Sequence, residues 1–125
     1  MKILLDTNVL LWLLGDDNRL APKAREIIKN AQEIAISELS LWEISIKVSI
    51  GKLRPIPGLL NTVRDLKFRR LSLSDEHLRR YEALPLLHRD PFDRMLVAQA
   101  SVENLALLTS DIFLNSYGIN VVGAN

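Results

Sequence analysis

Short apolar runs alternate along the chain with longer segments in which apolar residues recur at helical spacing. The run at residues 3–5 is wholly apolar, which is typical of a strand buried on both faces, and residues 105–108 repeat this pattern. Residues 69–74 alternate polar and apolar positions, which is typical of a strand with one solvated face. Strands are therefore expected at residues 3–5, 33–37, 69–74, 105–108 and, as an edge strand, 119–122.

Helical periodicity and capping residues place helices between these strands. Thr7 or Asn8 is expected to cap the first helix, Ser37 the third, and Asp90 the helix that begins at Pro91. Helices are expected at residues 9–14, 22–31, 38–50, 59–68, 75–81 and 91–103, with at most a short helix at 111–115. Because strands and helices alternate throughout, the sequence predicts an α/β fold with a parallel sheet covered by helices on both faces.

Composition and charge narrow the class of protein. The chain has 125 residues, of which 48% are hydrophobic and 25% charged, which suits one globular domain over residues 1–125. The net charge of +1 excludes a bulk basic field for nucleic acid. The absence of cysteine excludes disulfides and thiolate metal sites, and it fits a reducing cytoplasm. No apolar run approaches membrane-spanning length and no signal peptide is evident, so we expect a cytoplasmic protein without a membrane partner.

Four acidic residues stand in unusual contexts. Asp6 and Asp111 each follow a buried-type strand, Asp93 lies in the first turn of a helix, and Glu43 lies in an otherwise apolar helical stretch. Ligands bind at the carboxyl ends of parallel strands, so the four side chains are expected to meet there. Each acid also has a purely structural interpretation, namely a helix cap for Asp6, a turn for Asp111, a capping-box partner of Asp90 for Asp93, and an exposed helix face for Glu43.

A cluster of carboxylates requires a compensating charge. Two carboxylates about 5 Å apart repel by roughly 3 kcal/mol at an effective dielectric near 20. A hard divalent cation removes this cost, and an oxygen-only ligand set suits Mg²⁺ or Mn²⁺. Such an ion activates water and polarises phosphoryl oxygens. The acid pattern therefore favours phosphodiester hydrolysis over zinc chemistry.

The stretches that carry these acids resemble those of the PIN-domain endoribonucleases, and in particular the VapC-like toxins of toxin–antitoxin pairs. The matching stretches are residues 4–12 (LLDTNVLLW), 40–44 (SLWEI), 88–94 (HRDPFDR) and 108–111 (LTSD), with Lys47, 51–53 and 98–100. The resemblance implies that Asp6, Glu43, Asp93 and Asp111 form a catalytic quartet, in which Asp6, Asp93 and Asp111 bind Mg²⁺ or Mn²⁺. It also implies a sheet order 3-2-1-4-5, an RNA substrate, a homodimer and an antitoxin partner.

Further residues are assigned around this quartet. Thr7, Asn8, Thr109 and Ser110 are expected to orient the acids by hydrogen bonding. Lys47 and Arg94 are possible phosphate contacts, although Lys47 also has the spacing of a salt-bridge partner for Glu43. His88 is interpreted as a loop histidine, because nothing near it in the sequence suggests a general base. Trp12 and Trp42 are expected to pack in the core, Trp42 on a helix face shared with Leu39, Ile46 and Ile50.

The sequence therefore predicts a metal-dependent endoribonuclease of the toxin type. Two related alternatives are a PIN nuclease of RNA processing or DNA cleavage and an inactive PIN-like scaffold that binds a partner. A phosphotransferase or receiver domain is disfavoured because it would need a lysine placed after a strand, and no lysine of this chain has that position.

Overall fold

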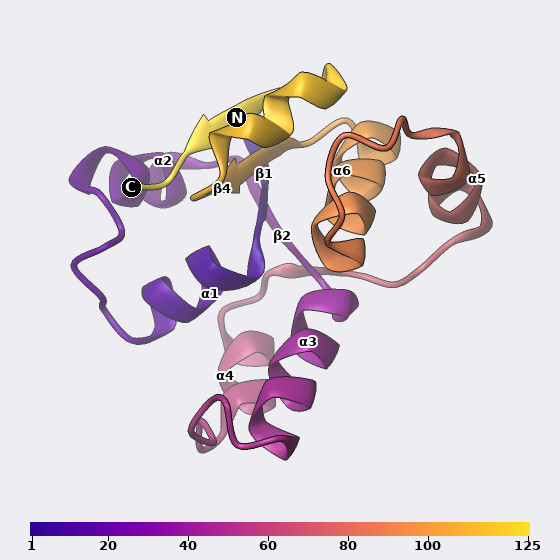
Figure 1. Cartoon of the computed structure of the whole chain (residues 1–125). Helices are drawn as coiled ribbons and strands as arrows, with labels where there is room; N and C mark the ends of the chain where they lie inside the picture. The colour runs from indigo at the N-terminus through magenta and orange to yellow at the C-terminus, as the bar shows by residue number, and fades with distance from the viewer.

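The computed structural model describes residues 1–125 as a five-stranded sheet with helices on both faces (Figure 1). All strand pairs are parallel, and the order is β3-β2-β1-β4-β5. The strands are β1 (Lys2–Leu5), β2 (Glu33–Ser37), β3 (Arg69–Leu71), β4 (Ala106–Thr109) and β5 (Val121–Gly123). This confirms the predicted α/β class and sheet order, and it places β1 at the centre.

Alternation along β1 divides the core into two layers. Ile3 and Leu5 face one hydrophobic cluster, and Leu4 faces the other. The first cluster is covered by α1 (Thr7–Leu14), α2 (Pro22–Asn30), α3 (Glu38–Ser49) and α4 (Leu59–Asp65). The second is covered by α6 (Pro91–Glu103) and the 3₁₀ helix η1 (Ile112–Tyr117). The helix α5 (Asp75–Ala83) packs on α6, on the side away from the sheet (Figure 1).

Capping residues that the sequence indicated fix the first residues of two helices. Asp90 caps α6, accepting hydrogen bonds from the amides of Phe92 and Asp93, and Pro91 occupies the first helical position. Ser37 caps α3 in the same way. The cap of α1 differs from the prediction, because Asp6 rather than Thr7 or Asn8 accepts the free amide hydrogen of Val9.

The buried face of α3 also differs from the prediction. Leu41 and Ile44 are buried in the core, whereas Trp42 is 58% exposed and Ile50 is 60% exposed. The apolar residues of α3 are spread around the helix, so its periodicity is compatible with more than one buried face. Packing against α1 and β2 selects the face that carries Leu41 and Ile44. Trp12 is buried as predicted, at 8% exposed. No helix is both long enough and apolar enough to cross a bilayer.

Candidate functional site

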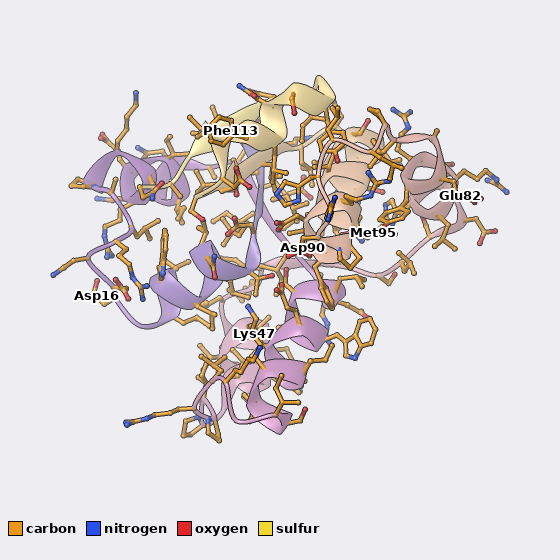
Figure 2. All side chains as sticks on the ribbon, viewed as in Figure 1. Asp16, Lys47, Glu82, Asp90, Met95 and Phe113 are labelled. Atoms are coloured by element: carbon orange, nitrogen blue, oxygen red, sulfur yellow. The ribbon has the colours of Figure 1, made fainter.

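The two central strands bring acidic residues together at their carboxyl ends. Asp6 directly follows β1, and Asp111 lies two residues beyond β4, which is hydrogen-bonded to β1. Glu43 reaches this edge from α3 and Asp93 from the first turn of α6. In Figure 2, Lys47 on α3 and Asp90 at the start of α6 mark two sides of this region. Four segments distant in sequence thus converge on one site.

Asp6 is the most fully hydrogen-bonded of these acids. It is only 5% exposed, its Oδ1 accepts the amide hydrogen of Val9 at 2.8 Å, and its Oδ2 accepts from the Thr109 hydroxyl and from the amide of Ser110 at 3.3 Å. Burial raises the pKa of Asp6, while these donors act to lower it. Asp6 therefore caps α1 and contributes a carboxylate to the site at the same time.

Glu43 is held by partners from two helices. The Thr7 hydroxyl donates to Oε1 of Glu43 at 2.6 Å, and Lys47 Nζ lies 3.3 Å from Oε2. Ser40 Oγ lies 2.9 Å from the Thr7 hydroxyl, which extends this network. Ser40 was not predicted, although its position three residues before Glu43 on α3 places it on the same helix face.

Asp93 differs from the other three acids because its carboxylate accepts no hydrogen bond from the protein. Burial raises its pKa to about 7, and the negative charges of Asp90, Asp6 and Glu43 add to this effect, whereas His88 opposes it. The raised pKa shows that the surrounding structure disfavours the ionised form. A cation bound beside Asp93 would reverse this.

Asp111 is oriented by contacts from two directions. Its Oδ1 accepts the amide hydrogen of Phe113 at 3.1 Å and so caps η1, and its own amide donates to the Thr109 hydroxyl at 3.0 Å. Its Oδ2 lies 3.0 Å from Nε2 of His88. His88 lies in the loop before α6, as expected, but its ring contacts an acid of the site, which the sequence did not indicate. Its contact with Asp111 spans 23 positions, so nothing local in the sequence indicated it.

Two residues that were expected at the site lie elsewhere. Arg94 is 5% exposed, and its guanidinium donates to the carbonyl of Pro85 at 2.8 Å and packs 4.8 Å from the Tyr81 ring centroid. It is thus a buried structural arginine, not an accessible phosphate contact. Asn8 is exposed and makes no side-chain hydrogen bond to the acids. Lys47 pairs with Glu43, as its spacing suggested.

The donor set fits a hard divalent cation. Asp93 and Asp111, together with His88, each offer a ligand atom within 4.8 Å of the others. Charge interactions place Asp6 and Glu43 beside Asp93. Carboxylate oxygens predominate and no thiolate is present, so the chemistry of the set matches Mg²⁺ or Mn²⁺. The carboxylate of Asp93, which accepts no hydrogen bond from the protein, has the most to gain from such an ion.

Comparison with known proteins assigns the family. The sequence model of the PIN domain matches residues 3–118, which is nearly the whole chain. The chain belongs to the PIN domain family. The resemblance drawn from the four motifs is therefore confirmed at the level of the family. This PIN domain is also 26% identical over 118 residues to Ribonuclease VapC22 of Mycobacterium tuberculosis, covering 92% of this chain and 91% of that protein.

Solved structures share the fold of this PIN domain. It superimposes on a chain of VapBC2 from Rickettsia felis bound to promoter DNA with a TM-score of 0.75 at 18% identity, covering 100% of both chains. The DNA-bound VapBC of Salmonella typhimurium gives 0.74 at 17% identity, with 100% and 99% covered. A toxin–antitoxin complex from Klebsiella pneumoniae gives 0.71 at 19% identity, with 99% and 98% covered.

Proposed function

We propose that this PIN domain is a Mg²⁺- or Mn²⁺-dependent endoribonuclease and the toxin of a toxin–antitoxin pair, acting in the cytoplasm. The observation that carries the proposal is the carboxylate of Asp93, which accepts no hydrogen bond from the protein and lies near Asp6, Glu43 and Asp111 of three other segments. The name of the Mycobacterium tuberculosis relative, a ribonuclease, supports the choice of RNA as substrate. The structural neighbours that are VapBC complexes support an antitoxin as partner.

The residues of the site have three roles under this proposal. Asp6, Asp93 and Asp111 hold the ion, which when bound lowers the pKa of a water and polarises a phosphoryl oxygen. Glu43 orients the attacking water and accepts its proton. Thr7 and Lys47 hold the Glu43 carboxylate in place for that step, while Thr109 and Ser110 do the same for Asp6.

Substitution of Asp93 tests the nuclease activity. Asp93→Asn preserves the shape of the side chain and removes its charge, so we expect RNA cleavage with Mg²⁺ to fall at least about 100-fold, as for loss of a group acting in the transition state. EDTA should abolish cleavage by the wild type. Glu82→Gln is the matched control, because Glu82 is an exposed acid on α5, far from the site in Figure 2.

Each outcome of this experiment has a distinct meaning. A folded Asp93→Asn protein that cleaves RNA at the wild-type rate would remove Asp93 from the metal-binding set. A wild type that binds Mg²⁺ or Mn²⁺ but cleaves no RNA would favour the partner-binding scaffold instead.

The toxin role needs a test in cells. Induced expression of the chain should arrest bacterial growth, expression of Glu43→Gln should not, and co-expression of the cognate antitoxin should restore growth. Growth that is unaffected by a cleaving wild type would favour a nuclease of RNA processing. Sedimentation of the purified chain tests the homodimer that the family resemblance implies.

A further inference from the structure

The hydrogen bonds of His88 determine which of its ring nitrogens carries the proton. Nδ1 of His88 lies 3.3 Å from the backbone amide of Asp90, which can only donate, so Nδ1 acts as the acceptor. In the neutral ring the proton is then on Nε2. Nε2 lies 3.0 Å from Oδ2 of Asp111, and this geometry makes Nε2–H the donor to that carboxylate.

The backbone of His88 is held independently of its ring. Its amide donates to the Tyr117 hydroxyl at 2.8 Å, and Arg94 donates to the same hydroxyl at 3.2 Å. Arg94 also donates to the carbonyl of Pro85 at 2.8 Å, at the start of the loop that carries His88. Since Asp111 caps η1 and Tyr117 is its last residue, His88 contacts both ends of this helix.

Beside a metal site, a histidine can bind the ion itself or orient another ligand, and this geometry distinguishes the two roles. A ring nitrogen that carries hydrogen has no lone pair for a metal, so Nε2 in this tautomer is not a ligand. It can instead orient a ligating carboxylate, which is a common role for a residue next to the ligands. The Asp111 side chain is 34% exposed, and the amide of Phe113 holds only its Oδ1, so Oδ2 has no other protein donor than His88.

We propose that His88 is a positioning residue that fixes the Asp111 carboxylate next to Asp93 by donating Nε2–H, and that it is not itself a metal ligand. The inference rests on the proposed metal-dependent function of this site. It also deepens that proposal, because a site in which only oxygen atoms bind the ion keeps a preference for Mg²⁺ and Mn²⁺ over Zn²⁺.

The tautomer can be observed directly in the full chain. The chain has two histidines, so long-range ¹H–¹⁵N spectra of the labelled protein at one fixed pH resolve both rings, and His88→Gln assigns them. We expect the Nε2–H tautomer for His88 both in EDTA and with saturating Mg²⁺. A switch to the Nδ1–H form on addition of Mg²⁺, with a shifted Nε2 resonance, would make His88 a ligand and overturn the proposal.

His77 provides an internal reference for this measurement. Its Nδ1 accepts the backbone amide hydrogen of Ser74 at 3.1 Å, and its Nε2 lies 2.9 Å from Oε2 of Glu103. It therefore has the same pattern of contacts away from the four acids, and its signals should not change with Mg²⁺.

Calorimetric titration with Mn²⁺ tests whether the hydrogen bond from His88 to Asp111 raises the metal affinity of the site. His88→Leu removes the donor, so we expect the affinity to fall about 10- to 100-fold, the usual effect of losing a group that orients a ligand. His88→Gln keeps an N–H donor and should recover most of the affinity. Leu86→Ala, an 89% exposed residue of the same loop, is the matched control and should bind Mn²⁺ like the wild type.

The outcomes distinguish this inference from the proposed function. Equal Mn²⁺ affinity of the wild type and a folded His88→Leu protein would overturn the positioning role even if the wild type cleaves RNA. Reduced affinity with recovery in His88→Gln would support the positioning role even if no RNA is cleaved. If His88→Leu does not fold, the tautomer spectra of the wild type and the affinity of His88→Gln remain decisive.

Discussion

Among the single residues of the site, Asp93 stands apart because the protein supplies no donor for its carboxylate. Asp6 accepts three hydrogen bonds, Glu43 is held by Thr7 and Lys47, and Asp111 accepts from Phe113 and faces His88. Burial and three nearby carboxylates raise the pKa of Asp93 to about 7. Hydrogen bonds thus offset part of the cost of burying a carboxylate at Asp6, whereas none does so at Asp93.

The raised pKa of Asp93 predicts how the stability of the metal-free protein depends on pH. The folded state holds the Asp93 proton up to about pH 7, whereas the unfolded chain loses it near 3.8, so the unfolding free energy falls as pH rises between these values. Asp93→Asn removes this contribution. In EDTA above pH 7 we expect the variant to exceed the wild type by on the order of a few kcal/mol, with the difference vanishing in acid.

Urea denaturation across this pH range measures the difference. An Asp93→Asn protein that is less stable than the wild type in alkaline EDTA would indicate that the carboxylate has a structural role. Glu82→Gln serves again as the control, and its stability should follow that of the wild type at every pH.

A buried arginine without a carboxylate partner holds the loop that carries His88. The Arg94 guanidinium donates to the carbonyl of Pro85 and to the Tyr117 hydroxyl, so Arg94→Ala removes one donor from each of these groups and also removes the stacking on Tyr81. We expect a loss of about 2–4 kcal/mol in unfolding free energy. Arg89→Ala, at an exposed position of the same loop, should change it by less than about 0.5 kcal/mol. Equal losses in urea denaturation would contradict this role of Arg94.

At the scale of elements, α3 and α6 are joined directly beside their acids. Trp42 precedes Glu43 and Phe92 precedes Asp93, and the two aromatic rings meet edge to face with centroids 5.5 Å apart. The contact lies on the exposed side of α3, away from the core. It therefore ties the positions of two acids without contributing much buried area.

The two tryptophans should consequently differ in their effect on stability. Trp12 is 8% exposed in the main core, so Trp12→Ala is expected to cost about 3–5 kcal/mol. Trp42→Ala loses mainly the contact with Phe92, so we expect about 0.5–1.5 kcal/mol. Chemical denaturation of both variants measures this contrast. A Trp42→Ala cost equal to that of Trp12→Ala would show that α3 packs by its other face in solution.

At the scale of the whole molecule, the site joins the two layers of the fold. Asp6 and Glu43 come from the layer that contains α1 and α3, whereas Asp93 comes from α6 on the opposite face of the sheet. An ion bound among them would link both layers to the central strands. Unfolding of the chain would disperse its ligands, so binding of the proposed ion would stabilise the folded protein.

The coupling predicts a thermal shift on metal binding. At a Mn²⁺ concentration about 100 times the dissociation constant, binding adds about 2.7 kcal/mol to the unfolding free energy and raises Tm by several degrees. EDTA should reverse the shift, and Asp93→Asn should show little of it. Scanning calorimetry measures these effects. A wild type whose Tm does not respond to Mg²⁺ or Mn²⁺ would contradict the metal site.

Local signals in the sequence indicated most of the fold and the acids of the candidate site. Strand and helix assignments rest on periodicities of a few residues, so they match the structure except at boundaries, as where β3 ends at Leu71 and not near residue 74. The acids were recognisable because each one adjoins a buried-type strand or an apolar helical stretch. His88 and the burial of Arg94 were not recognisable, because their partners lie at distant or irregular positions of the chain.

The sequence by itself determined the order of elements, the caps at Ser37 and Asp90, and the positions of Asp6 and Asp111 after the strands, because these depend on neighbouring residues along the chain. Only the tertiary structure decided which face of α3 is buried, which acid lacks a donor, and which nitrogen of His88 faces Asp111. These features depend on distances between segments that come together only when the helices have packed on both faces of the sheet. A local pattern carries no information about such distances.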